Sequence, residues 1–524
     1  MLLHDLLTRT SEQRADTCAL VVAEERLNYG EVCARSDGLA CRLVEAGIKP
    51  QDRVVLFMDN SVAQVLAIYA VLKAGAIIVP VNPLTKTEKL AFILKDAEAA
   101  GFISDGHLRS VYLPALEHYL PALTIINGSD DRDGAIACEG FAALSVPGPA
   151  PAVGIIDQDL AAIIYTSGST GEPKGVMLTH HNMVSAATSV SQYLGLGASD
   201  RILCCLPLAF DYGLYQVLMA FMVGAQVILE RSFAFPAVVI KTMAHEQVTV
   251  FPGVPTMFSI LLGREGMLDA YDLSHIRLIT NTAASLPPQH IARLKAHFLN
   301  ARIFSMYGLT ECKRVTYLPP EELDARPTSV GRGMPNEEVY LVAPDGRRLP
   351  PGSVGELVVR GSHVMRGYWR RPKETAERLK PGRYPGETVL HSGDIFHMDE
   401  AGYLYFIGRS DDIIKSRGEK VSPKEIENIL YALPGVLEAA VVGIDDEIID
   451  QAVHAFVVLS EGSGLTERAI VRYCNGHMES YMVPKAVHIV AALPKTDTGK
   501  IRKSGLSSMA RERMAETVDA VRVV

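Results

Sequence analysis

Short apolar runs alternate with amphipathic stretches along the first 328 residues of the chain. A helical pattern over Tyr29–Ala46 leads into Arg53–Phe57 and then Ala76–Pro80, two short runs rich in Val and Ile that are typical of buried strands. Strands that alternate with helices predict βαβ units and a mainly parallel sheet. The further candidate strands of this region are Arg201–Leu206, Ala225–Leu229, Val248–Phe251, Ile276–Ile279 and Ala301–Phe304.

The pattern changes near Ser329, where strand-like runs alternate with turns instead of helices. Glu338–Val342 and Gly355–Arg360 have the character of strands, and Pro344-Asp-Gly346 is a turn signal between them. We therefore expect a small antiparallel β-barrel or sheet that ends at about residue 409. Beyond it, a compact α+β pattern begins, in which Ser422 is the expected N-cap of a helix.

A chain of 524 residues is too long for one hydrophobic core, so several domains are expected. The fold class is α/β. A large N-terminal unit, residues 1–409, divides into α/β subdomains (about 1–328) and a β-rich subdomain (329–409). A small α+β C-terminal domain, residues 410–524, follows it.

Composition and charge exclude some classes of function. The net charge of −9 offers no basic footprint for nucleic acid. The most apolar segment, 65–81, is interrupted by Lys73, Gly75 and Pro80, which fits a core helix followed by a strand better than a membrane span. Eight cysteines show no metal-binding spacing, and the N-terminus lacks a signal-peptide pattern. These features predict a soluble cytoplasmic protein with reduced thiols.

The stretch Tyr165–Val176 follows the apolar run Leu160–Ile164 and is rich in Gly, Ser and Thr. Turn amides and hydroxyls bind phosphoryl oxygens, and the ammonium of Lys174 offsets their charge, so this loop suits a polyphosphate. It is not a Walker A loop, because Gly175 follows the lysine. The candidate ligand-binding residues are Thr166, Ser167, Gly168, Ser169, Thr170 and Lys174.

A second candidate stretch, Ser305–Glu311, follows the last predicted strand of the α/β region. Tyr307 offers a flat face for a nucleobase, and the Glu311 carboxylate is a suitable ligand for magnesium among phosphates. Taken alone, the stretch also fits a strand end, a turn and an exposed acid.

Together with His391–Asp394, Gly402–Arg409 and Leu493–Lys500, these stretches resemble the signatures of the AMP-forming adenylating superfamily, and they occur in the same order. That superfamily contains acyl-CoA synthetases, luciferases and the adenylation domains of peptide synthetases. The resemblance implies an ATP-dependent adenylation of a carboxylic acid with release of pyrophosphate. Transfer of the acyl group to a thiol follows, with CoA as the expected acceptor.

The resemblance also implies roles for individual residues. Tyr307 stacks on adenine, Thr310 lies beside the phosphate, and Glu311 holds a magnesium ion. Asp394 binds the ribose hydroxyls, as a carboxylate does in dinucleotide sites, with Arg409 in support.

Further implied roles concern a C-terminal domain that rotates. Lys500 lies on a mobile loop and reaches into the adenylation site, and Asp411 is the pivot of the hinge. Lys415 and Gly418 face the active site only after rotation, and Gly418 lines the tunnel of the thiol acceptor.

The expected acyl pocket departs from that of many acyl-CoA synthetases, which carry a His where this chain has Phe210. The pair Phe210–Asp211 resembles amino-acid adenylating enzymes, in which the Asp binds the substrate ammonium. Alternatively, Asp211 caps a helix that starts at about Tyr212. The other predicted pocket residues are Tyr215, Ala283, Ala284 and Met306. Lys313 and Arg314 stand where small residues are common in the superfamily. Three alternatives are open for them: contact with a polar substrate, with an acceptor phosphate, or with solvent only.

Three readings compete with a CoA ligase. Within the same chemistry, the enzyme activates an amino acid or another polar acid and loads it on the phosphopantetheine of a carrier protein. A non-catalytic relative is disfavoured, because Lys174, Glu311, Asp394 and Lys500 are all present. A P-loop kinase or ATPase is disfavoured by the missing Walker A loop.

Overall fold

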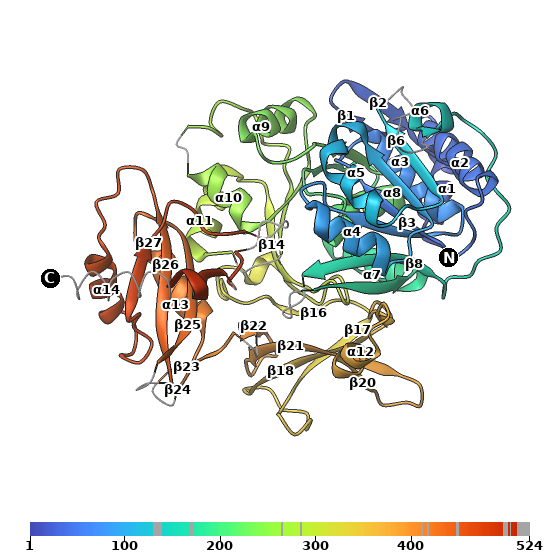
Figure 1. The fold of residues 1–524 in the computed structure, drawn as a ribbon. Helices are drawn as coiled ribbons and strands as arrows, with labels where there is room; N and C mark the ends of the chain where they lie inside the picture. The colour runs from blue at the N-terminus through green and yellow to red at the C-terminus, as the bar shows by residue number, and fades with distance from the viewer. Residues whose placement is uncertain are drawn as a thin grey trace.

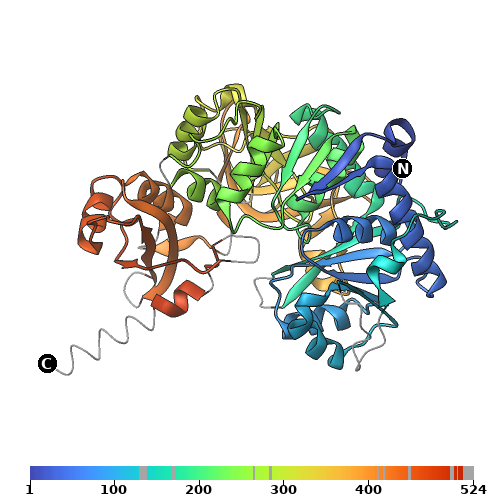
Figure 2. The ribbon, with the colours of Figure 1, turned by 90° about the horizontal axis from the view of Figure 1, so that it is seen from above.

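The computed structural model describes residues 1–128, 139–167, 172–263, 266–282, 286–409, 412–416, 419–446, 450–495, 501–503 and 505–510. Figure 1 shows two α/β layers at the N-terminal end, a β-rich unit below them and a smaller C-terminal unit to one side. Seen from above in Figure 2, the C-terminal unit again lies beside the larger part.

One sheet has eight strands in the order β19-β9-β8-β4-β3-β5-β6-β7. The pairings from β8 to β7 are parallel, whereas β9 pairs antiparallel with both β8 and β19. The strands are β3 (Arg53–Phe57), β4 (Ile77–Val81), β5 (Gly101–Asp105), β6 (Leu123–Asn127), β7 (Glu139–Gly140), β8 (Leu160–Ser167), β9 (Pro173–Thr179) and β19 (Gly367–Tyr368). The accompanying helices are α3 (Val62–Lys73), α4 (Thr87–Asp96), α5 (Arg109–His118) and α6 (Phe141–Leu144).

A second sheet has nine strands in the order β16-β15-β14-β13-β12-β10-β11-β1-β2, parallel from β14 to β1. They are β1 (Cys18–Val22), β2 (Glu25–Asn28), β10 (Arg201–Cys204), β11 (Gln226–Leu229), β12 (Val250–Gly253), β13 (Leu278–Asn281), β14 (Arg302–Tyr307), β15 (Thr316–Leu318) and β16 (Arg332–Gly333). Its helices are α1 (Asp5–Arg14), α2 (Tyr29–Glu45), α8 (Asp211–Val223), α9 (Pro236–His245), α10 (Pro255–Leu262) and α11 (Pro288–His297). The helix α7 (His180–Leu194) contacts α8 and also β8 and β9 of the first sheet. The predicted mainly parallel α/β architecture is confirmed.

Two apolar helices form the centre of the core. Every residue of α3 is buried, and so is α8 from Tyr212 to Phe221. The rings of Tyr69 and Phe221 join the two helices, with centroids 5.5 Å apart. Burial on all sides explains why the segment around α3 is so apolar. Within the described part of the chain, no helix is long and apolar enough to cross a membrane.

The β-rich unit is an antiparallel five-stranded sheet with the order β17-β18-β21-β20, in which β22 also pairs with β21. The pairings among its described strands do not close into a barrel, so the open-sheet alternative describes it. The elements are β17 (Glu337–Val342), β18 (Val354–Gly361), α12 (Pro372–Arg378), β20 (Leu379–Pro381), β21 (Thr388–Met398) and β22 (Leu404–Arg409).

The C-terminal unit is a second five-stranded sheet with helices. As predicted, Ser422 is the N-cap of its first helix, and its hydroxyl accepts from the Glu425 N–H at 3.4 Å. The elements are β23 (Ile414–Ser416), β24 (Glu419–Val421), α13 (Pro423–Ala432), β25 (Val436–Asp446), β26 (Asp450–Leu459), α14 (Glu467–Asn475) and β27 (Ala486–Ile489).

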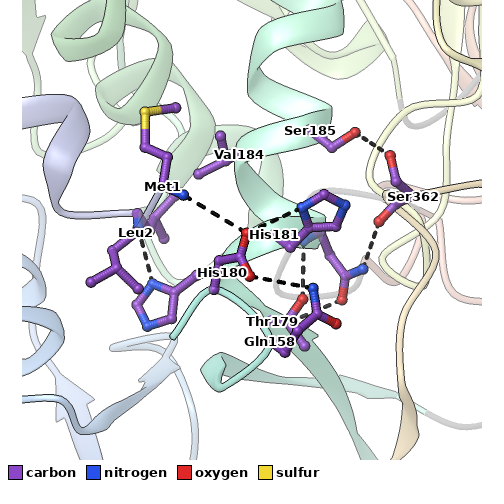
Figure 3. A network of polar contacts seen from close by, with 12 residues as sticks. Met1, Leu2, Gln158, Thr179, His180, His181, Val184, Ser185 and Ser362 are labelled. Carbon is purple, nitrogen blue, oxygen red and sulfur yellow. Dashed lines mark hydrogen bonds and ion pairs between the residues drawn. The ribbon is translucent and has the colours of Figure 1, made fainter. Parts of the chain in front are cut away.

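A polar network fixes the start of α7, the helix that directly follows β9 (Figure 3). The Met1 ammonium lies 3.7 Å from the Asp157 carboxylate. His180 Nδ1 accepts from the backbone of Leu3, and burial lowers the pKa of His180 to about 4, so it stays a neutral acceptor. Asn182 Nδ2 donates to the Ser362 carbonyl at 2.6 Å, which ties α7 to the loop after β18. The β8–β9 hairpin is thereby held against both the chain start and the β-rich unit.

Candidate active site

The predicted phosphate loop connects β8 to β9, which form an antiparallel hairpin. Thr166 lies opposite Lys174 in the register, and its hydroxyl donates to the Lys174 carbonyl at 3.5 Å. Gly168, Ser169 and Thr170 lie outside the described residues, as does the side chain of Ser167. The hairpin therefore places Thr166 and Lys174 at the base of this loop.

Tyr368 connects the hairpin to Glu311. The short strand β19 pairs with β9, which places the Tyr368 ring 5.7 Å from Lys174 Nζ. The Tyr368 hydroxyl donates to Glu311 Oε1 at 2.7 Å. Burial raises the pKa of Tyr368, so the phenol keeps the proton that it donates. Tyr368 thus contacts both Lys174 and Glu311, which are 137 positions apart in the sequence.

Tyr368 was not among the residues predicted from the sequence. Its local signal is only a Gly-Tyr-Trp triplet at 367–369, and the pairing of β19 with β9 is what gives the side chain its position.

Tyr307 and Asp394 form a second contact near the end of β14. The Tyr307 hydroxyl donates to Asp394 Oδ2 at 2.6 Å. The Tyr307 ring packs edge-on against Phe396 and nearly parallel to Phe406, with centroids 4.9 and 6.2 Å away. Arg409 lies opposite Asp394 in the register of β21 and β22. The structure therefore brings together three of the residues predicted to bind the nucleoside.

One oxygen of the Asp394 carboxylate has no hydrogen-bond donor among the described residues. The residue is only 4% exposed, and burial raises the pKa of its carboxyl, while the Tyr307 hydrogen bond and the charge of Arg409 oppose that rise. Oδ1 is buried and accepts no hydrogen bond from any residue that the structure describes. A buried carboxylate oxygen without a donor is costly, and a ligand hydroxyl would satisfy it.

Thr310 and Glu311 lie in the tight connection between β14 and β15. The Val315 N–H donates to the Tyr307 carbonyl at 2.9 Å, which closes the connection. A Cβ atom on Gly308 would lie 2.2 Å from the Lys313 carbonyl, so only glycine fits there. The Met365 N–H donates to the Glu311 carbonyl at 2.8 Å and holds the connection from the far side.

Asp211 lies at the start of α8, one residue earlier than the predicted helix start. Phe210 occupies the N-cap position, and Asp211 is the first helical residue. Lys313 Nζ lies 3.3 Å from Asp211 Oδ2 and donates to the Asp211 carbonyl at 2.8 Å. The geometry therefore favours a paired carboxylate over a helix cap.

Lys313 and Arg314 are buried, 3% and 2% exposed, so the reading in which they contact only solvent is wrong. Lys313 Nζ lies 4.3 Å from the centre of the Tyr215 ring, and burial lowers the pKa of the ammonium to about 7 although Asp211 raises it. The buried Met306 accepts from the Tyr193 hydroxyl at 2.9 Å. Ala283 and Ala284 lie outside the described residues.

Of the residues expected to act with a domain rotation, Lys415 is the one that the structure describes. Lys415 is an exposed residue of β23 whose backbone N–H donates to Gln451 at 2.9 Å. It lines a groove between the β-rich and C-terminal units, together with His391, Gly393 and Lys424. Asp411, Gly418 and Lys500 lie outside the described residues.

Comparisons with known proteins agree with this arrangement. Residues 7–369 match the family described as AMP-binding enzyme, and residues 425–500 match the AMP-binding enzyme C-terminal domain. The chain is 34% identical to feruloyl-CoA synthase of an Amycolatopsis species over 481 residues, which cover 91% of this chain and 92% of that protein. It is 30% identical to tyrocidine synthase 3 of Brevibacillus parabrevis over 96% of this chain, but spans only 8% of that protein.

Among solved structures, anthranilate CoA ligase AuaEII in complex with anthranoyl-AMP superposes with a TM-score of 0.89 at 27% identity and covers 98% of each chain. The match extends over both the N-terminal and the C-terminal units. The two family matches together account for most of the chain. The chain therefore belongs to the AMP-binding enzyme family and is an AMP-forming ligase that joins an acid to a thiol.

Proposed function

We propose that the edge formed by the β8–β9 hairpin, the β14–β15 connection and Asp394 is the adenylation site of this ligase. The observation that carries the proposal is the convergence of Lys174, Tyr368 and Glu311 beside the Tyr307–Asp394 pair. Ligands of parallel α/β sheets bind at the carboxyl ends of the strands, and Tyr307 is the last residue of β14. In this proposal, Tyr307 and Asp394 hold the adenosine, with Arg409 in support.

The first half-reaction joins two anions. The carboxylate of the substrate attacks the α-phosphorus of ATP, forms a mixed anhydride and releases pyrophosphate. Lys174 and the loop donors offset the charge of the phosphates, and Lys500 would act where charge develops on the reacting oxygens. Thr310 is assigned to the phosphate beside Glu311.

A magnesium ion fits the donor set around Glu311. Carboxylate oxygens are the ligands that magnesium prefers, and the Tyr368 hydroxyl orients the Glu311 carboxylate from one side. When bound, the ion would polarise phosphoryl oxygens as a Lewis acid.

The second half-reaction needs a thiol. CoA is the proposed acceptor, because relatives that span the length of this chain are CoA ligases. A carrier-protein phosphopantetheine is the second candidate, which the likeness to tyrocidine synthase 3 favours. Asp411 is the proposed hinge, with Lys415 and Gly418 on the face that admits the thiol. Both ATP and reduced thiols are supplied in the cytoplasm, where we place the enzyme.

Replacement of Glu311 tests the site. Glu311→Gln removes a charge that faces the phosphates, so acid-dependent pyrophosphate exchange should fall at least about 100-fold, a typical loss for one group that stabilises transition-state charge. Glu321→Gln is the matched control, because Glu321 lies ten positions on and forms an ion pair with Arg302 at the surface. Equal exchange rates in the two variants would contradict the assignment.

A further inference from the structure

Two buried cations lie directly after Glu311. Lys313 and Arg314 are 3% and 2% exposed, and Arg314 is the largest fully buried side chain in the described part of the chain. Burial of a charge is costly unless another charge or hydrogen bonds offset it. Each of the two cations therefore needs a partner.

Asp211 is the partner of Lys313. Its carboxylate lies 3.3 Å from the Lys313 ammonium, and its carbonyl accepts from the same nitrogen at 2.8 Å. A substrate ammonium at Asp211 would have to compete with a cation that the chain already supplies. The structure therefore argues against the hypothesis that Asp211 selects an amino acid by its amine.

Arg314 has no such partner. Its guanidinium lies over the Tyr212 ring, 5.0 Å from the centroid. Among the residues that the structure describes, no carboxylate pairs with it, and its Nε is buried without a hydrogen-bond acceptor. A guanidinium presents a rigid fork of donors that matches a carboxylate, so this group lacks its usual counterpart.

The other buried acid of this region does not balance Arg314. The charges of both Glu337 and Arg314 act on the Tyr193 phenol. Glu337, however, accepts from the Met334 N–H and lies 2.9 Å from His363 Nε2. Burial raises the pKa of Glu337 and lowers that of His363 to about 4, which disfavours the charged form of both groups.

The place of Arg314 suits the far end of an acyl pocket. Tyr212, over which it lies, belongs to the first turn of α8 and donates to the Thr280 carbonyl at the carboxyl end of β13. Glu311, the proposed metal ligand, is three residues away in the β14–β15 connection. A substrate that reaches from the phosphates toward these rings would therefore bring its distal end to the guanidinium.

We propose that the acid substrate of this ligase carries a second anionic group at its far end, and that Arg314 binds this group. The class expected is the dicarboxylic acids, of which one carboxylate is adenylated and the other pairs with Arg314. This inference rests on the proposed function, because it assumes that the adenylated carboxylate lies beside Glu311.

The test measures acid-dependent pyrophosphate exchange with acids of three chain lengths. At each length, the group at the end far from the reacting carboxylate is a methyl, a carboxylate or an ammonium group. The acids are butanoate, pentanoate and hexanoate, the corresponding dicarboxylates, and the corresponding ω-amino acids. The dicarboxylate should exceed both partners of equal length by at least 10-fold in kcat/KM at the preferred length. A higher kcat/KM for the monocarboxylates or the ω-amino acids than for the dicarboxylates would overturn the inference. Exchange with those two classes of acid and none with the dicarboxylates would overturn it too.

Arg314→Met should then reduce kcat/KM for the preferred dicarboxylate by about 10- to 100-fold and leave the monocarboxylate of equal length unchanged. Arg302→Met, at an exposed ion pair, is the matched control and should keep the wild-type ranking. Arg314→Lys keeps a cation and should retain part of the preference, which guards against a Met variant that does not fold. An unchanged ranking in a folded Arg314→Met protein would overturn the inference, whereas wild-type protein without exchange on any acid would overturn the proposed function itself.

Discussion

At the residue scale, the proposed ribose contact depends on the Asp394 carboxylate. One carboxylate oxygen accepts from Tyr307, and the other is buried without a donor among the described residues. A ribose offers two adjacent hydroxyls, of which one suffices for the free oxygen. Burial raises the pKa of the carboxyl, and a hydroxyl donor would restore stability to its charged form.

Asp394→Ala should therefore weaken the use of ATP but not of its 2′,3′-dideoxy analogue. Hydrogen bonds to a charged group are worth about 1.5–3 kcal/mol, so kcat/KM for ATP should fall by about 10- to 100-fold. Tyr307→Phe is the control, because it removes the same Tyr–Asp hydrogen bond and keeps the carboxylate. Equal losses with both nucleotides would contradict a ribose contact.

Motifs in the sequence singled out residues that the structure brings into contact. Tyr307 pairs with Asp394, and Lys174 and Glu311 both contact Tyr368, while the roles implied for them stay predictions. The pairing of Asp211 with Lys313 was not predictable, because 102 positions separate them and neither has a periodic signal. Only the fold shows that the Asp211 carboxylate already has a cation.

At the scale of elements, the connection between β14 and β15 carries Glu311, Lys313 and Arg314. Lys313 has a φ of +65°, a left-handed conformation that is uncommon for residues other than glycine. This conformation accompanies the contact of its ammonium with Asp211. The same connection carries Glu311, which accepts from Tyr368, and Arg314, whose guanidinium lies over the Tyr212 ring.

The stability of the wild type relative to Lys313→Met should rise with pH between about 7 and 9. Burial lowers the pKa of Lys313 from an ordinary 10.5 to about 7. In this range the unfolded chain binds a proton that the folded chain has released, so the free energy of unfolding increases with pH. The slope for one proton cannot exceed about 1.4 kcal/mol per pH unit. Urea denaturation of both proteins at three pH values measures it, and parallel pH profiles would contradict the lowered pKa.

Element types followed from local pattern, and element pairing did not. Arg53–Phe57 forms β3 as predicted, and Tyr29–Ala46 forms α2 to within one residue. The two-residue strand β19 has no periodicity of its own, so only its pairing with β9 defines it. Because that pairing positions Tyr368, the place of this residue in the site could not be predicted from the sequence.

At the scale of the molecule, the central feature is the pair of large sheets with α3 and α8 buried in one core. The sequence predicted the α/β class and the later β-rich region, since both depend on local alternation. Sheet order was not predictable: β1 joins β11 across roughly two hundred residues, and long-range pairing leaves no local trace. The carboxyl ends of the strands and the β-rich unit then meet at the proposed site.

The central claim, that the enzyme joins the acid to AMP through the carboxylate oxygen, is tested most directly with an acid labelled with ¹⁸O in its carboxylate. After thiol attack on the acyl carbon, the bridging oxygen leaves with AMP. We predict one ¹⁸O atom in each AMP released and none in pyrophosphate. Unlabelled AMP, label in pyrophosphate, or release of ADP instead of AMP would contradict the account.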